Sequence, residues 1–283
     1  MIKALHINST APFRIRKKGA DYTMADFDVL CTIMSALMWK KYNGPIKLYA
    51  DKMAYDFYAS LGILDIWDEI DTEVLENLPQ DIDYNIYWAG SKLFAIKHET
   101  VPFAVIDTDL IVWKSLQDYL NGKYLVALHT EPLNEVYPPQ YDLHTAEDYQ
   151  YDSEWDWNQL PCNCAFTYYE SEDFKNYYTS SAIKFMKNNN ARPKNLVIQM
   201  VFAEQRLFSM CARKMLLNIH TLLDSPFSQN NDVVTHLWGG KDVARELPEE
   251  NEKLCRALAL KIQQIFPDFI SHHIELEFWK KYL

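Results

Sequence analysis

The chain has 283 residues, 48% of them hydrophobic, and a formal net charge of −11. This allows one large domain, or one domain with an extension. An acidic chain is not expected to coat nucleic acid or an anionic membrane, since both attract basic surfaces. No apolar run approaches the ~20 residues of a membrane span, and the start does not resemble a signal peptide, so a cytoplasmic protein is expected.

The cysteines and glycines exclude further classes. Five scattered cysteines do not form a disulfide framework, and the C-x-C of Cys162 and Cys164 lacks the spacing of a zinc site. The chain contains neither G-x-G-x-x-G nor a P-loop. A phosphorylated ligand would therefore have to be neutralised in another way, for example by a metal ion on carboxylates.

The apolar pattern predicts alternating strands and helices. Strands are expected over 2–7, 45–50 and 103–106, and helices over about 20–44, 51–62 and 83–99. A strand at 164–169, helices at about 171–188 and 196–212, strands within 215–219 and 233–236, and a helical segment at 249–283 follow. This order predicts a mostly parallel sheet with helices on both faces, whose ligands bind beyond the carboxyl ends of the strands.

Residues 131–160 interrupt the alternation. The segment is acidic, aromatic and Pro-containing, and it has no clear period. A connection of this length is either functional or disordered. We consider two alternatives: an ordered flap over a pocket, or a surface meander packed by its own aromatic side chains.

Two carboxylates follow the strand "FAVI" and precede the apolar run "LIVW". They belong to the sequence Asp107-Thr108-Asp109. Because burying unpaired carboxylates is costly, they should meet a cation. Two oxygen ligands suit Mg²⁺ or Mn²⁺, with substrate phosphates completing the coordination shell. The alternative is a strand-end pair that caps backbone amides or binds a lysine.

A second candidate element is "VVTHLWGGKD", residues 233–242. His236 can be a third metal ligand. Gly239 and Gly240 allow the backbone to approach a ligand closely, and Lys241 can hold phosphate oxygens. The alternative is a buried histidine before a glycine turn.

These two elements resemble those of GT-A fold glycosyltransferases, closest to the glycogenin-like retaining enzymes of family 8, and the chain would be a bacterial relative. In that family a D-x-D and an H-x-x-G-x-K hold the metal and the nucleotide-sugar pyrophosphate. Asp107 and Asp109 match the first motif, and His236, Gly239 and Lys241 match the second. The tryptophan that often follows the family's lysine is missing. The resemblance implies a GT-A α/β fold, Mn²⁺ or Mg²⁺ as cofactor, and a nucleotide-diphosphate sugar, expected to be a UDP-sugar, as donor.

Weaker matches fall in the family's order. Lys92 lies where a basic residue touches the donor, Asn163 where an asparagine lines the sugar pocket, and Glu204-Gln205 where an acid–glutamine pair lies near the reacting carbon. The family usually has Asp at the position of Glu204. By fold analogy, Asn8 would lie near the nucleobase. The alternatives are a solvated lysine for Lys92, a turn residue for Asn163 and a surface ion pair for Glu204.

The expected function is metal-dependent transfer of a sugar, with retention, to a glycan, a protein or a small molecule. Residues 1–248 would form the catalytic domain, with Thr108 among its donor-binding residues, and 249–283 a helical extension. One alternative is a non-catalytic protein of the same fold that binds sugar nucleotides or glycans. Another is a phosphatase of the haloacid dehalogenase type, although Leu110-Ile111 stands where Gly-Thr is expected. No nucleic acid partner or integral membrane segment is expected.

Overall fold

The computed structural model describes residues 1–137, 139–189, 193, 195–226, 228, 232–237 and 247–283. Its centre is a seven-stranded sheet of order β3-β2-β1-β4-β7-β6-β8. The strands are β1 (Lys3–Asn8), β2 (Ile46–Ala50), β3 (Glu69–Asp71), β4 (Phe103–Ile106), β6 (Leu125–Ala127), β7 (Phe166–Tyr169) and β8 (Ile219–Thr221). They pair in parallel except at β7, which is antiparallel to β4 and β6.

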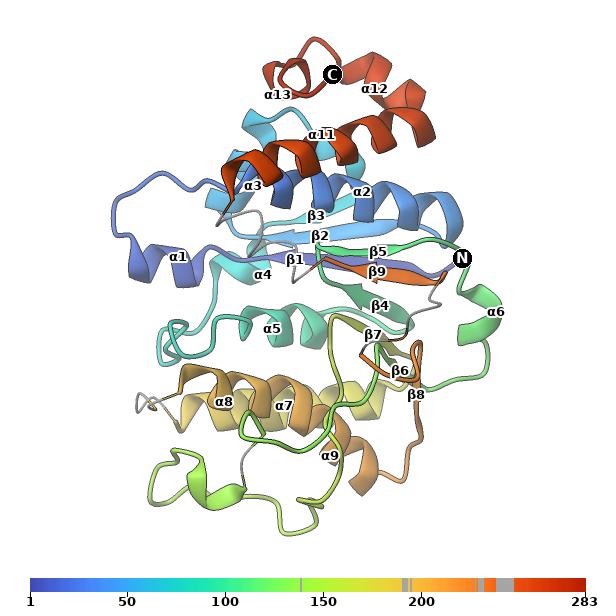
Figure 1. Cartoon of the computed structure of the whole chain (residues 1–283). Coiled ribbons are helices and arrows are strands. Elements are labelled where there is room, and N and C mark those ends of the chain that lie inside the picture. Colours follow the sequence, from blue (N-terminus) through green and yellow to red (C-terminus); the bar gives the residue numbers. More distant parts are fainter. Residues whose placement is uncertain (138, 190–192, 194, 227, 229–231, 238–246) are drawn as a thin grey trace.

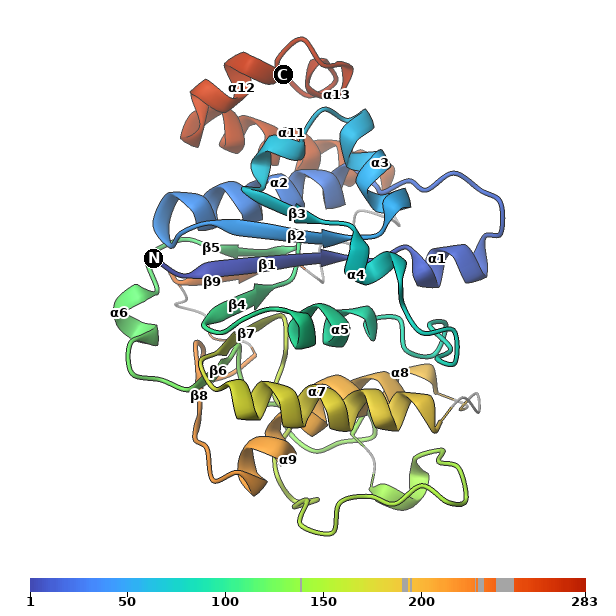
Figure 2. The ribbon, with the colours of Figure 1, turned by 180° about the vertical axis from the view of Figure 1, so that it is seen from behind.

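Helices cover both faces of this sheet (Figures 1 and 2). One side carries α2 (Asp26–Tyr42), α3 (Lys52–Ser60), α11 (Pro248–Ile265), α12 (Pro267–His273) and α13 (Glu277–Lys280). The other carries α5 (Ser91–His98), α7 (Glu172–Lys187), α8 (Leu196–Val201) and α9 (Leu207–Lys214). The predicted α/β class, with a mostly parallel sheet, helices on both faces and a helical C-terminal segment, is confirmed.

Shorter elements complete the chain: α1 (Ala11–Arg16), α4 (Glu73–Glu76), α6 (Gln117–Leu120), the 3₁₀ turns η1 (Leu64–Ile66) and η2 (Gln140–Asp142), and the π-helical η3 (Phe202–Arg206). A second, two-stranded sheet pairs β5 (Leu110–Val112) with β9 (Val234–His236). None of the helices in the described ranges is long and apolar enough to span a bilayer.

The sheet separates two apolar cores. Successive residues of β1 point to opposite faces, so Ala4 belongs to one core and Leu5 to the other. Helix α2 lies between the sheet and α11, which explains why apolar residues surround it instead of forming one stripe. Cys255, Ala259 and Ile262 of α11 are completely buried in the core that α2 shares. The C-terminal helices therefore pack as part of that core.

Side-chain caps determine where several helices begin. Asp51, the residue before α3, accepts a hydrogen bond from the backbone of Ala54 at 3.0 Å, and Ser171 and Asn195 cap α7 and α8 in the same way. Such caps satisfy backbone N–H groups that have no partner within the helix. These residues directly follow a strand or a loop, so the chain turns into a helix at a definite position.

The helix predicted over 83–99 is wrong in its first half. Residues 83–90 form turns, and only Ser91–His98 is α-helical. Asp83 starts the first turn because its carboxylate accepts from the backbone of Asn85 at 2.8 Å and its carbonyl accepts from Tyr87 at 2.9 Å. A side chain that offers the backbone such bonds competes with helix formation.

The prediction for 196–219 also needs correction. The helix over 196–212 is interrupted by the π-helical turn η3, which carries Glu204 and Gln205. The strand expected within 215–219 starts only at Ile219. Helix α9 continues to Lys214, and Leu216 then takes a positive φ of 57°, a conformation that no strand contains.

The 131–160 segment runs past the helices below the sheet (Figure 1). Its aromatic side chains contact residues of α7 and η3. Trp157 stacks on Phe202 with ring centroids 5.5 Å apart, and Tyr151 contacts Phe185 and Phe202. The buried guanidinium of Arg206 donates to the carbonyls of Tyr137 and Trp157. These contacts match the alternative of a meander packed by its own aromatics; a role as a flap stays a prediction.

A buried histidine connects strand β1 to its neighbours. His6 Nδ1 accepts a hydrogen bond from the indole of Trp67 at 3.2 Å, and His6 Nε2 lies 3.0 Å from the hydroxyl of Ser35 on α2. Since Trp67 can only donate, Nε2 carries the proton and donates to Ser35. Burial lowers the pKa of His6 to about 3, although the charge of Asp109 opposes this shift. His6 is therefore neutral in the folded protein.

The neutral state of His6 predicts a pH-dependent stability. Because the unfolded chain binds a proton at a higher pH than the folded one, stability from this residue is present above about pH 6.5 and is lost as the pH falls towards 3. The loss is about 1.4 kcal/mol for each pH unit, or about 2 kcal/mol between pH 6.5 and 5. Urea unfolding at both pH values should show a smaller loss for His6→Gln than for the wild type. The exposed His98→Gln is the control, and equal losses for His6→Gln and the wild type would contradict the prediction.

Candidate functional site

The first two acidic residues of the site lie where β4 ends. The backbone N–H of Asp107 donates to the carbonyl of Ala165 at 2.8 Å, which continues the β4–β7 pairing by one residue. Leu110 then donates to the carbonyl of Asp107 at 2.9 Å, closing a tight turn into β5. Asp107 and Asp109 thus leave the sheet at its carboxyl edge, as predicted for a ligand site.

The small sheet brings a histidine to the same place. In the β5–β9 ladder, His236 lies opposite Leu110, and the backbone of Leu237 donates to the carbonyl of Asp109 at 2.9 Å. The imidazole Nε2 of His236 is 3.7 Å from Asp109 Oδ1. Pairing between two short strands therefore joins residues that are far apart in the sequence.

Asp107, Asp109 and His236 fit a divalent cation. One possible ligand atom from each side chain lies within 4.8 Å of the other two. Two carboxylates and one imidazole form a donor set that suits Mn²⁺ or Mg²⁺ when phosphate oxygens or waters complete the shell. These three residues would hold the metal ion.

A lysine connects the candidate metal ligands to Glu204. Lys92 Nζ, on α5, lies 2.8 Å from Asp107 Oδ1 and 2.6 Å from Glu204 Oε1 on η3. The same ammonium donates to the carbonyl of Cys164 at 3.4 Å. With its side chain 14% exposed, Lys92 is not a solvated helix lysine, and Glu204 is buried instead of forming a surface pair.

Burial and charge shift the titration of this pair. Burial disfavours the charged form of Lys92, but the carboxylates of Asp107 and Glu204 outweigh it and raise the lysine pKa well above its usual value. Burial raises the pKa of Glu204, Lys92 opposes that shift, and the negative charge of Asp107 adds to it. The ammonium therefore stays charged, and its charge favours the ionised form of Glu204.

One pocket of about 530 Å³ contains most of the predicted site residues. Its walls include Lys92, Asp107, Thr108, Asp109, Asn163, Glu204, Gln205 and His236. Asn163 also has the turn role that was the alternative, because its Oδ1 accepts from the backbone of Ala165 at 3.0 Å. Trp88 and Cys164 line the pocket as well, although neither was predicted. The spacing of four residues between Trp88 and Lys92 is the sequence signal that could have indicated Trp88 as a pocket residue.

Other predicted residues lie elsewhere. Asn8 ends β1, but its side chain contacts Tyr58 at 2.6 Å and Tyr22 at 3.3 Å, and only its neighbour Ile7 lines the pocket. Gly239, Gly240 and Lys241 lie outside the described residues, within the range 238–246.

A chain of hydrogen bonds supports the D-x-D turn from behind. Trp67 donates to His6, His6 donates to Ser35, and the Ser35 hydroxyl donates to the carbonyl of Leu110. Leu110 directly follows Asp109 and pairs with His236. Residues of the core thus hold the turn that carries the candidate metal ligands.

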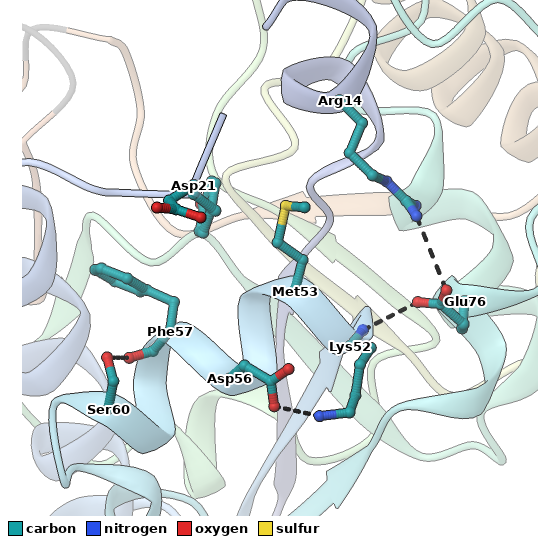
Figure 3. A pocket seen from close by; sticks show the side chains of 9 residues that line it. Arg14, Asp21, Lys52, Met53, Asp56, Phe57, Ser60 and Glu76 are labelled. Carbon is teal, nitrogen blue, oxygen red and sulfur yellow. Dashed lines mark hydrogen bonds and ion pairs between the residues drawn. The ribbon is translucent and has the colours of Figure 1, made fainter. Parts of the chain in front are cut away.

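A second hollow, of about 490 Å³, lies between α1 and α3 (Figure 3). Its charged side chains are directed at one another: Arg14 lies 3.8 Å from Glu76, and Lys52 pairs with Asp56. Phe57 and Met53 form apolar parts of the wall. Among the described residues, the side chains that could jointly hold a metal ion are those of the first pocket.

A family profile described as "Family of unknown function (DUF6734)" matches residues 13–271. The chain belongs to this family. No curated protein matches the sequence of this DUF6734 member.

Solved structures that resemble the DUF6734 chain include glycosyltransferases. The PaToxG glycosyltransferase has a TM-score of 0.42 and 11% identity, covering 90% of this chain and 77% of its own. Mouse xyloside xylosyltransferase 1 has a TM-score of 0.37 and 10% identity, covering 82% and 90%. HddC from Yersinia pseudotuberculosis has a TM-score of 0.35 and 16% identity, covering 63% and 80%.

The shared lysine predicts strong coupling within the DUF6734 site. Lys92→Met should destabilise the protein by about 3–5 kcal/mol, because it leaves the buried carboxylate of Glu204 and the half-buried carboxylate of Asp107 without their cation. Glu204→Gln in the same chain should recover part of this loss, with a coupling of about 1–3 kcal/mol between the two changes. Urea unfolding of the two single variants and the double variant measures it. Lys97→Met, exposed on the same helix, is the control, and simple additivity would refute the coupling.

The three-residue ligand set predicts binding of Mn²⁺. Electron paramagnetic resonance of free Mn²⁺ should show binding by the wild type, weakened about 10-fold or more in His236→Gln, in which an amide replaces the imidazole ligand. His220→Gln, at an exposed position of β8, is the matched control. Equal affinity in His236→Gln and the wild type would remove His236 from the ligand set.

Proposed function

We propose that this protein is a metal-dependent glycosyltransferase that moves a sugar from a nucleotide-diphosphate sugar to an acceptor. One observation carries the proposal: a candidate metal set and a lysine-bound glutamate, which come from different elements of the fold, line the same pocket. The volume of about 530 Å³ lies within the range of roughly 300–1,000 Å³ that small-molecule sites occupy.

The reaction breaks the bond between the anomeric carbon and a phosphate oxygen. Negative charge then grows on the leaving diphosphate, and a divalent cation on Asp107, Asp109 and His236 supplies Lewis acid stabilisation of that charge when it is bound. The three side chains set where the diphosphate would lie. Thr108, in the same turn, lines the pocket beside them and would contact the donor.

Glu204 and the residues around it would contact the sugar. Positive charge develops on the anomeric carbon as the leaving group departs, and the carboxylate of Glu204 would stabilise it. Lys92 orients this carboxylate, since its ammonium lies 2.6 Å from Glu204 Oε1. Asn163 and Gln205 line the wall around Glu204 and offer amide groups for sugar hydroxyls.

We expect retention at the anomeric carbon, as the resemblance to retaining enzymes implies. The cofactor would be Mn²⁺ or Mg²⁺, and a UDP-sugar the donor. By the family resemblance, Lys241, which lies outside the described residues, would hold phosphate oxygens of the donor. A glycan, a protein side chain or a small molecule would be the acceptor.

Nucleotide release tests the proposal. The protein is incubated with Mn²⁺ and UDP-glucose, UDP-galactose, UDP-N-acetylglucosamine or GDP-mannose, and free nucleoside diphosphate is measured. One donor should give metal-dependent release that falls at least about 100-fold in Asp109→Asn, because a metal ligand is lost. The exposed Asp118→Asn serves as the matched control.

The same experiment separates the alternatives. Metal-dependent binding of a donor without release, even when free glycans are added as acceptors, would indicate a binding protein of this fold. Hydrolysis of simple phosphate esters would indicate a phosphatase. Release that Asp109→Asn leaves unchanged would show that the D-x-D turn does not serve the reaction.

A further inference from the structure

One tryptophan of this protein lies open to solvent at the candidate active site. Trp88 lines the pocket and is 36% exposed, whereas the other tryptophans in the described part of the chain are buried or half-buried. A large apolar ring that stays in contact with water gives up the stabilisation that burial provides. Its position beside Lys92, Asp107 and Glu204 points to a contact with a ligand.

The turn that carries Trp88 is anchored on both sides of the tryptophan. Tyr87 is completely buried, and its hydroxyl donates to the carbonyl of Asn189 at 2.8 Å. Gly90 donates to the carbonyl of Tyr87 at 2.8 Å, and a Cβ at Gly90 would approach the sulfur of Met186 to 2.8 Å. Residues on both sides of Trp88 are thus held against α7, so the indole is presented from a fixed backbone.

The rest of the pocket is polar. Its lining consists mainly of acids, amides, one lysine and one histidine. Among the described lining residues, Trp88 offers the large apolar aromatic face. The charge of Lys92 is already shared by two carboxylates. The described lining therefore offers no further lysine or arginine for an acidic ligand on this side, and a neutral molecule fits it best.

We propose that Trp88 is a stacking platform for a neutral pyranose ring, and so a specificity-determining residue of the pocket. One face of many pyranoses presents mainly C–H bonds, while the hydroxyls point outward around the ring. Such a face covers an indole without losing hydrogen bonds, and its slightly positive hydrogens meet the negative face of the π system. The hydroxyls at the ring edge then reach the amides and acids of the surrounding wall.

This inference deepens the proposed sugar transfer and rests on it for the identity of the pyranose. The ring can be that of the donor sugar or that of a glycan acceptor, because both present the same C–H face. A contact with the donor sugar needs the nucleotide, whereas a contact with an acceptor does not. Separate titrations therefore distinguish the two sources.

Fluorine NMR of protein labelled with 5-fluorotryptophan tests the contact directly. Trp88→Phe assigns the resonance of Trp88 by its absence. The probes are methyl glucoside, methyl galactoside, maltotriose and glucuronate without nucleotide, and UDP, UDP-glucose and UDP-galactose with Mn²⁺. The Trp88 resonance should shift with a neutral saccharide or with a UDP-sugar. The resonance of Trp113, assigned with Trp113→Phe and bonded to Thr235 away from the pocket, should not shift.

Affinity measurements on variants complete the test. Saturation-transfer NMR should show the responding ligand bound at least about 5-fold more weakly by Trp88→Ala and less affected by Trp88→Phe, which keeps an aromatic face. Trp113→Phe should bind as the wild type does. Equal binding by Trp88→Ala and the wild type would refute the stacking role.

The outcomes separate this inference from the proposed function. A shift with UDP-sugar but not UDP assigns the donor sugar to Trp88, and a shift with free saccharide assigns the acceptor. A shift with UDP alone, an equal response to glucuronate, or no shift with any probe would overturn the inference, even if Mn²⁺-dependent nucleotide release is intact. A saccharide response without nucleotide release would keep the inference and refute the transferase.

Discussion

The pocket depends on one ammonium group that two acids share. Asp107 follows a strand, Glu204 lies in a π-helical turn, and Lys92 stands between them on a third element. Two carboxylates this close repel each other, and burial raises the pKa of Glu204. Lys92 offsets this repulsion, and it ties the sheet edge to the helical layer that covers it. Any change at this lysine therefore alters the charge and the shape of the site together.

The second constraint is the small β5–β9 sheet. It forms because the chain turns sharply after Asp107 and runs outside the main sheet, where β9 pairs with it. The pairing register decides which side chain of β9 meets the carboxylates. A shift by one residue would turn His236 to the other face of the strand. The hydrogen bonds from Trp67 through His6 and Ser35 to Leu110 hold this register from the core side.

A π-helical turn, η3, forms the part of the pocket that carries Glu204 and Gln205. In η3 the π-helical geometry places Glu204 and Gln205 towards the pocket, and π turns occur often at functional sites. Tyr178 donates to the carbonyl of Glu204 at 2.8 Å, and the Tyr137 hydroxyl donates to Gln205 Oε1. Tyr137 belongs to the 131–160 segment. Through it, that segment is mechanically connected to residues that would contact the sugar.

The sequence alone determined the α/β fold class and pointed to the residues of the candidate metal site. The 3.6-residue and two-residue periods depend on local geometry, so the main helices and strands could be predicted with errors at their ends. The apolar flanks of Asp107 and Asp109 placed both carboxylates at a strand end. His236 could be grouped with them through the family resemblance.

The contacts between residues that are distant in the sequence were decided by the tertiary structure alone. Lys92 and Glu204 are 112 residues apart, and their ion pair exists because the sheet order places α5 beside η3. The π turn at Glu204, the exposure of Trp88 and the place of Asn8 beside two tyrosines likewise depend on neighbours from distant parts of the chain. Local periodicity carries no information about such contacts. These contacts form only when the helices pack on both faces of the sheet and surround its carboxyl edge.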